Sequence, residues 1–132
     1  MAAKWLLKEP GYEAARKILF QFKEEQLELI APNLLVAEVC SALVKRVSRQ
    51  LLLPQEARKG LAFLLLNTPV LSGIEELCGS ALELATAHRR SFYDCVYLAL
   101  ALRENCELVT ADERFGSLAI AYPQIRFLGE WQ

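Results

Sequence analysis

Short apolar runs alternate with longer amphipathic segments along the chain, and this alternation restricts the fold more than any other feature of the sequence. Apolar residues recur at helical spacing in five segments, residues 9–24, 32–50, 54–66, 74–87 and 92–104. Between them lie four short runs that suit buried strands, residues 27–31, 69–72, 107–110 and 125–128. Strands that alternate with helices predict an α/β domain with a parallel sheet whose two faces are covered by helices.

Length and composition fit one globular domain over residues 1–132. The apolar fraction is 54% and the charged fraction is 23%, which is typical of a chain that buries a core. No internal repeat, low-complexity tract or linker-like stretch divides the sequence. The formal net charge is −1, so binding of nucleic acid would depend on a local basic patch.

The cysteines and the N-terminal residues indicate a reducing compartment. The four cysteines lie far apart without a C-x-x-C pair, which fits neither a zinc ribbon nor a disulfide framework. Lys4, Lys8 and Glu9 interrupt the apolar run that a signal peptide needs. No run approaches the length of about twenty apolar residues that a membrane helix needs, so we expect a soluble, cytoplasmic protein.

Three acidic residues stand where a catalytic site could form. Asp112 follows the run that ends at Thr110, and open α/β sheets place their sites beyond the carboxyl ends of the strands. Asp94 stands at the start of the fifth helical segment, and Glu38 interrupts the apolar run NLLVAEVCSALV. Carboxylates that converge on one pocket suit Mg²⁺, which can activate water and neutralise a phosphoryl group under attack.

Each of the three acids also has a purely structural explanation. Asp94 fits a capping box with Ser91, and Asp112 fits a cap for the short segment 113–119. Glu38 fits a half-exposed flank of its helix. The residue types alone leave both explanations open.

The words around these acids resemble PIN-domain ribonucleases of the VapC toxin type. PNLLVAEVCSALVKR is similar to the family's glutamate-bearing helix, YDCVYLALAL to its tyrosine-aspartate helix start, and LVTADERF to its late strand and T-x-D turn. The resemblance runs over nearly the whole chain. It implies a three-layer α/β/α sandwich around a short parallel sheet, and Mg²⁺- or Mn²⁺-dependent cleavage of single-stranded RNA. It also implies a small antitoxin protein as partner.

The resemblance assigns a role to each site residue. Glu38, Asp94 and Asp112 would be the metal-binding carboxylates, and the hydroxyl of Thr110 would support the site. Metal-bound water would attack the phosphodiester, without a nucleophile from the protein. The competing hypothesis is a catalytically inactive PIN-like module that binds a partner protein or RNA.

The chain departs from the family's pattern at its beginning. The family opens with a strand that ends in an aspartate, and that aspartate would align just before Met1. Residues 3–7 resemble the helix start that follows it. The first strand and first aspartate are therefore expected to be missing, either because the true start lies upstream or because this copy is degenerate.

Basic and apolar clusters indicate further partners. Lys45 and Arg46, and Arg89 and Arg90 before Asp94, could touch RNA phosphates, although basic residues near a helix end also suit a solvated C-terminus. The second and third helical segments carry more apolar residues than one buried face needs, which predicts a homodimer. These residues are Leu34, Leu51, Leu52, Leu53, Leu61, Leu64 and Leu65.

Overall fold

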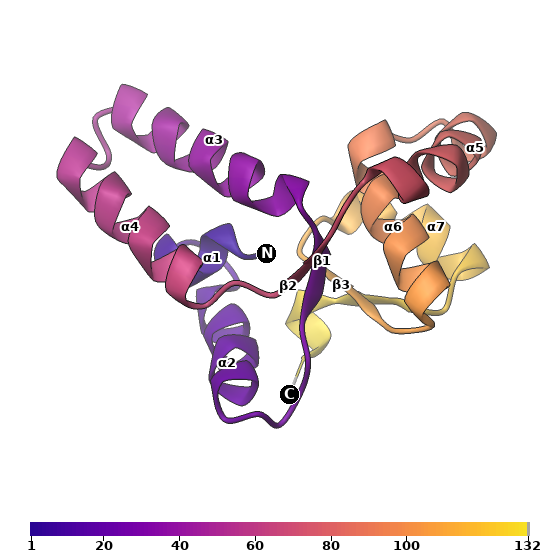
Figure 1. Cartoon of the computed structure of the whole chain (residues 1–132), viewed down its shortest axis with the longest axis horizontal. Helices are drawn as coiled ribbons and strands as arrows, with labels where there is room; N and C mark the ends of the chain where they lie inside the picture. The colour runs from indigo at the N-terminus through magenta and orange to yellow at the C-terminus, as the bar shows by residue number, and fades with distance from the viewer. Residues whose placement is uncertain (132) are drawn as a thin grey trace. The chain divides into compact units, whose positions relative to one another are not determined.

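The computed structural model describes residues 1–131, which form two compact units (Figure 1). The first unit comprises Ala2–Leu71, and the second comprises the chain from Ser72 onward together with Met1. The positions of the two units relative to one another are not determined, so each is described by itself. The expectation of one domain over residues 1–132 stays a prediction.

The first unit consists of helices and two short strands. In chain order these are α1 (Ala3–Leu6), α2 (Tyr12–Lys23), β1 (Ile30–Pro32), α3 (Leu34–Ser48), α4 (Pro54–Leu66) and β2 (Val70–Ser72), which begins in this unit and pairs with β1. The core is apolar: Trp5 is 2% exposed, Ile18 1% and Leu64 0%. Helix α4 begins at Pro54, whose missing N–H suits a first turn, and the Glu56 carboxylate accepts a hydrogen bond from the Leu53 N–H at 2.9 Å.

The second unit surrounds the strand pair β3 and β4. Its elements are η1 (Glu75–Leu77), α5 (Cys78–His88), α6 (Phe92–Glu104), β3 (Leu108–Thr110), η2 (Glu113–Phe115), α7 (Gly116–Ala121), β4 (Ile125–Phe127) and η3 (Leu128–Glu130). Strands β3 and β4 are parallel, with Leu108 opposite Ile125 and Thr110 opposite Phe127. A core of Leu98, Ala101, Leu108, Phe115, Leu118 and Ile125 joins α6, both strands and the η2–α7 segment.

The α/β class is confirmed, the parallel pairing is confirmed for β3 and β4, and all five predicted helices and four predicted strands are present. Among the described residues the strands form two separate pairs, β1–β2 and β3–β4, rather than one sheet. Several boundaries differ: α2 begins at Tyr12 rather than at residue 9, and β1 spans Ile30–Pro32 rather than residues 27–31. The second helix begins at Leu34 rather than at Pro32, because Pro32 belongs to strand β1. The fourth helical segment divides into η1 and α5.

Helix α1 was not predicted, since four residues carry too little helical periodicity to be detected. Within residues 1–131, no helix is both long enough and apolar enough to cross a membrane.

Candidate metal and RNA site

Asp94 is fixed in the first turn of helix α6. The Ser91 hydroxyl caps this helix by accepting a hydrogen bond from the Asp94 N–H at a donor–acceptor distance of 3.5 Å. The next turns bury Cys95, Val96 and Leu98, so the helix cannot rotate without exposing its core face. The cap uses the backbone of Asp94, and the carboxylate stays available for other partners.

Asp112 is fixed in the turn that follows strand β3. The buried Thr110 hydroxyl accepts a hydrogen bond from the Asp112 N–H at 3.0 Å. The Asp112 carboxylate in turn accepts the Arg114 N–H at 2.9 Å and so caps η2. Phe115, which is 4% exposed, anchors the end of η2 in the core. The structural cap proposed for Asp112 is therefore present, and one carboxylate oxygen takes part in it.

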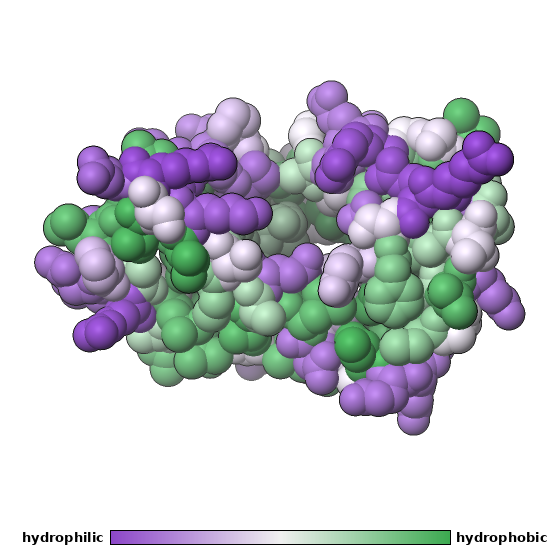
Figure 2. Space-filling model, turned by 90° about the horizontal axis from the view of Figure 1, so that it is seen from above, coloured by the Kyte–Doolittle hydropathy of each residue, from purple (hydrophilic) through white to green (hydrophobic). Residues whose placement is uncertain are grey.

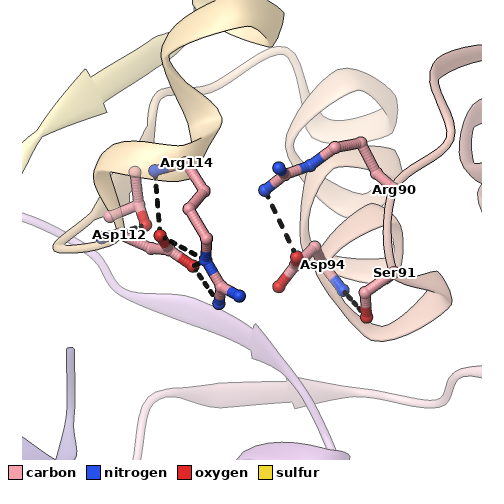
Figure 3. Close-up of polar contacts among 6 residues, drawn as sticks. Arg90, Ser91, Asp94, Asp112 and Arg114 are labelled. Carbon is pink, nitrogen blue, oxygen red and sulfur yellow. Dashed lines mark hydrogen bonds and ion pairs between the residues drawn. The ribbon is translucent and has the colours of Figure 1, made fainter.

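The Arg114 guanidinium occupies both carboxylate oxygens of Asp112 (Figure 3). Its Nε lies 2.9 Å from Oδ1 and 2.9 Å from Oδ2, and its Nη2 lies 2.6 Å from Oδ2. These hydrogen bonds hold the pKa of Asp112 below its ordinary value, since they favour the charged carboxylate. Asp112 is therefore stabilised as an anion.

The pKa of Asp94 is shifted in the opposite direction to that of Asp112. Burial raises its pKa above the ordinary value, and the neighbouring negative charge of Asp112 adds to this effect, while Arg90 and Arg114 oppose it. The Arg90 Nη2 lies 3.5 Å from Asp94 Oδ2, which is an ion-pair contact but a long one. This nitrogen and the Arg90 Nε are buried without a hydrogen-bond partner, so the ion pair satisfies neither.

Phe115 holds the Arg90 guanidinium in place. The guanidinium carbon lies 5.2 Å from the centre of the Phe115 ring, within the range of a cation–π contact. Figure 3 shows the guanidinium groups of Arg90 and Arg114 both directed toward the space between Asp94 and Asp112. Two acids and two arginines therefore form a charge-balanced group in the second unit.

The two carboxylates of this group are of the type that binds divalent cations. Carboxylate oxygens are the ligands that Mg²⁺ prefers, and Mg²⁺ is commonly bound through one or two carboxylates with water and substrate phosphates in the other positions. The negative charge of Asp112 contributes to the raised pKa of Asp94, and Figure 3 shows the two carboxylates on either side of the Arg114 guanidinium. Within residues 1–131, no group of three or more His, Cys, Asp or Glu side chains that could hold a metal is present.

Glu38, the third predicted metal ligand, lies in the other unit. It is on α3, next to the buried residues Leu35 and Val39, and its own side chain is exposed. Because the units are described separately, the convergence of Glu38 with Asp94 and Asp112 stays a prediction.

The four predicted RNA-binding residues have different environments. Lys45 is exposed on α3, whereas Arg46 donates a hydrogen bond to the Glu9 carboxylate at 2.8 Å. Arg89 is exposed and ends α5 with a positive φ of 53°. Arg90 faces Asp94 and Phe115 rather than solvent. Lys45 and Arg89 are therefore exposed, whereas Arg46 and Arg90 each face a carboxylate.

Arg114 and Phe115 were missed by the sequence interpretation. Arg114 stands two residues after a capping aspartate, a spacing at which both its backbone N–H and its side chain reach the carboxylate. The sequence Asp-Glu-Arg-Phe at residues 112–115 indicated this contact, because Arg114 lies two residues after Asp112 and directly before the apolar residue Phe115.

A groove of about 550 Å³ on the second unit lies apart from the acids. It is lined by α5, α6 and Tyr122, and neither Asp94 nor Asp112 contributes to it. The His88 Nε2 lies 3.0 Å from the Tyr122 hydroxyl in this groove. The groove is therefore a different feature from the candidate site.

Comparison with known proteins identifies the family. No curated protein matches the chain closely enough to name a relative. The family model for the PIN domain matches residues 2–121, which include Glu38, Asp94 and Asp112 and nearly all of the described chain. PIN domains are typically metal-dependent nucleases. The α/β fold agrees with this match, as do the carboxylates of Asp112 after β3 and of Asp94 at the start of α6. The chain belongs to the PIN domain family.

Proposed function

We propose that this protein is a metal-dependent endoribonuclease that cleaves single-stranded RNA. The observation that carries the proposal is the pair Asp94 and Asp112, two carboxylates that interact electrostatically, from elements that a common core holds in place. Membership of the PIN domain family supports a nuclease. The pair provides the oxygen ligands that a hard divalent cation requires.

Asp94 and Asp112 would hold Mg²⁺ or Mn²⁺, and Glu38 would be the third carboxylate. When bound, such an ion lowers the pKa of water and neutralises negative charge on a phosphoryl group. Thr110 positions Asp112 through the hydrogen bond that its hydroxyl accepts from the Asp112 N–H. Lys45 and Arg89 would contact RNA phosphates as exposed cations.

The finer assignment is a toxin of the VapC type that acts in the cytoplasm and is blocked by a small antitoxin protein. The similarity of YDCVYLALAL and LVTADERF to the corresponding words of that group supports it. Its test is co-purification with the product of a small neighbouring gene, together with relief of growth arrest when both are expressed.

Cleavage of a fluorescent single-stranded RNA in Mn²⁺ tests the nuclease proposal. Asp94→Asn and Asp112→Asn should each reduce the rate by at least about 100-fold, because loss of even outer-shell support costs a metal site about 10–100-fold. Glu113→Gln is the matched control, since Glu113 is an exposed acid of η2 beside the site. Equal loss of activity in the control, or full activity of Asp94→Asn, would refute the assignment.

The second candidate is an inactive PIN module that binds RNA or a protein. Arg114 favours it, because its guanidinium already occupies both oxygens of Asp112. RNA binding without cleavage at saturating Mn²⁺ would support this alternative over the nuclease.

A further inference from the structure

Arg114 competes with any metal for Asp112, and this inference rests on the proposed function. The guanidinium donates to both oxygens of this carboxylate, so a divalent cation would have to compete with Arg114 for them. Paired hydrogen bonds of this kind are the strong form of an arginine–carboxylate contact. Figure 3 shows the Arg114 guanidinium between Asp112 and Asp94.

The two arginines differ in how much packing surrounds them. The Arg114 side chain is 76% exposed, so its departure from Asp112 costs little packing. The Arg90 side chain is 17% exposed and lies against the Phe115 ring. One arginine of the group is therefore displaceable and the other is fixed.

We propose that Arg114 is an internal counter-ion of the acidic pair: a divalent cation displaces it from Asp112, and the released guanidinium then binds a phosphate of the RNA. A planar guanidinium recognises a phosphate through the same paired donors that it offers a carboxylate. Phe115 keeps the base of the Arg114 side chain beside the site, so the group is released over a short distance.

The first experiment observes the displacement itself by nuclear magnetic resonance. The Arg114 Nε–H signal is assigned by its loss in Arg114→Gln, and Mg²⁺ is then titrated into the wild-type chain. The signal should be protected from solvent exchange without Mg²⁺ and lose that protection at saturation. An Arg114 signal that keeps its position and protection while Mg²⁺ binds would overturn the proposal.

The second experiment compares affinities for Mn²⁺ by calorimetry. Arg114→Gln should bind Mn²⁺ about two- to fivefold more tightly than the wild-type chain, the range expected from loss of an exposed ion pair. Arg114→Lys keeps the charge but loses the paired geometry, and it should also bind more tightly. Arg103→Gln is the control, because Arg103 is ion-paired to Glu104 at 2.9 Å outside the site. Unchanged affinity in Arg114→Gln, or an equal gain in the control, contradicts the competition.

The third measurement separates the two parts of the proposal. At saturating Mn²⁺, Arg114→Gln should raise the KM for RNA about tenfold with a smaller change in kcat, since a phosphate contact of the bound substrate is lost. An unchanged KM would reject the phosphate contact. Loss of Mn²⁺ binding in Asp94→Asn shows that the metal site itself exists, so a failure of the Arg114 result is distinguishable from a failure of the nuclease assignment.

Discussion

Replacing either acid of the pair with asparagine should change the stability of the fold in opposite directions. The pKa of Asp94 is raised by burial and by Asp112, so its charge is unfavourable in the folded chain at neutral pH. The pKa of Asp112 is lowered by Arg114, so its charge is favourable there. Asp94→Asn should therefore raise the free energy of unfolding at pH 7, and Asp112→Asn should lower it.

The sizes follow from exposure and geometry. Asp112→Asn breaks the ion pair with Arg114, whose side chain is 76% exposed, so the cost is that of a surface pair, about 0.2–1 kcal/mol. Asparagine is as good a helix cap as aspartate, and the cap of η2 adds nothing to this cost. The Asp94 side chain is 26% exposed and its charge is disfavoured by burial, so Asp94→Asn should change stability in the opposite direction to Asp112→Asn.

The two differences also depend on pH in opposite ways. The penalty at Asp94 is absent below the ordinary pKa of 3.8, grows as pH rises toward the raised folded value and is complete above it. The contribution of Asp112 is complete above its ordinary pKa of 3.8 and disappears as pH falls through the lowered folded value.

Urea unfolding of the wild-type chain and both variants from pH 7 to below the ordinary pKa of 3.8, without metal, measures these differences. A destabilised Asp94→Asn at pH 7 would show that its charge is well compensated and would refute the reasoning.

Three further predictions concern the support of the site and the assembly of the chain. Thr110→Val should cost about 0.5–1.5 kcal/mol, since the Asp112 N–H loses its acceptor, and should weaken Mn²⁺ binding, whereas Thr110→Ser should keep both, as measured by urea unfolding and calorimetry. Phe115→Ala should cost about 3–5 kcal/mol by cavity formation and weaken Mn²⁺ binding, while Leu118→Ala, in the same core, should change stability alone. We also expect a homodimer through α3, α4 and the segment that joins them, because Leu51 and Leu53 in that segment and Leu65 on α4 are more than half exposed; Leu65→Glu should shift sedimentation toward monomer, and Ile120→Glu on α7 should not.

The surface behind the dimer prediction differs in part from the one inferred from sequence. Leu64 is fully buried and belongs to the core of the first unit, because it lies on the α4 face opposite the exposed side chains. Leu66, which was not included, is 85% exposed. In the left part of Figure 2, hydrophobic side chains gather below a row of hydrophilic ones. The dimer prediction rests on the exposed leucines Leu51, Leu53, Leu65 and Leu66. Periodicity identifies an apolar helix face but does not decide which of two adjacent leucines a neighbour covers.

Sequence reasoning predicted the elements of the fold better than the contacts of the site. The order of helices and strands followed from apolar spacing, which local residues determine. The sequence left open whether Asp112 is a helix cap or a metal ligand. In the structure one carboxylate oxygen caps η2, and the Arg114 guanidinium donates to both oxygens. A pairing of this kind depends on the direction of a flexible side chain in a turn, which no spacing rule determines.

The contact of Arg90 with Phe115 was also not predictable from the sequence. The position of Arg90 before Asp94 suggested either a contact with RNA phosphates or a solvated helix end, but the guanidinium lies over the ring of Phe115, which belongs to a later element of the chain. The apolar core that gathers α6, β3 and η2 determines this contact, so a residue that is local in sequence acquires a distant partner. A cluster of basic residues in the sequence gives the backbone position of each cation, but packing in the folded chain determines which partner its side chain contacts.

The charge balance of the group also predicts that metal and RNA bind cooperatively. In the folded chain the carboxylates of Asp94 and Asp112 are matched by the guanidinium groups of Arg90 and Arg114. A divalent cation adds positive charge without removing either arginine from the neighbourhood, so it is opposed unless an anion arrives with it. RNA phosphates supply that charge, and by linkage each ligand then strengthens the binding of the other by the same factor. Calorimetric titration of Mn²⁺ should therefore give a several-fold higher affinity in the presence of a non-cleavable, 2′-O-methylated RNA than without it. Equal affinities would mean that the two arginines do not oppose the metal, and that the group is balanced in some other way.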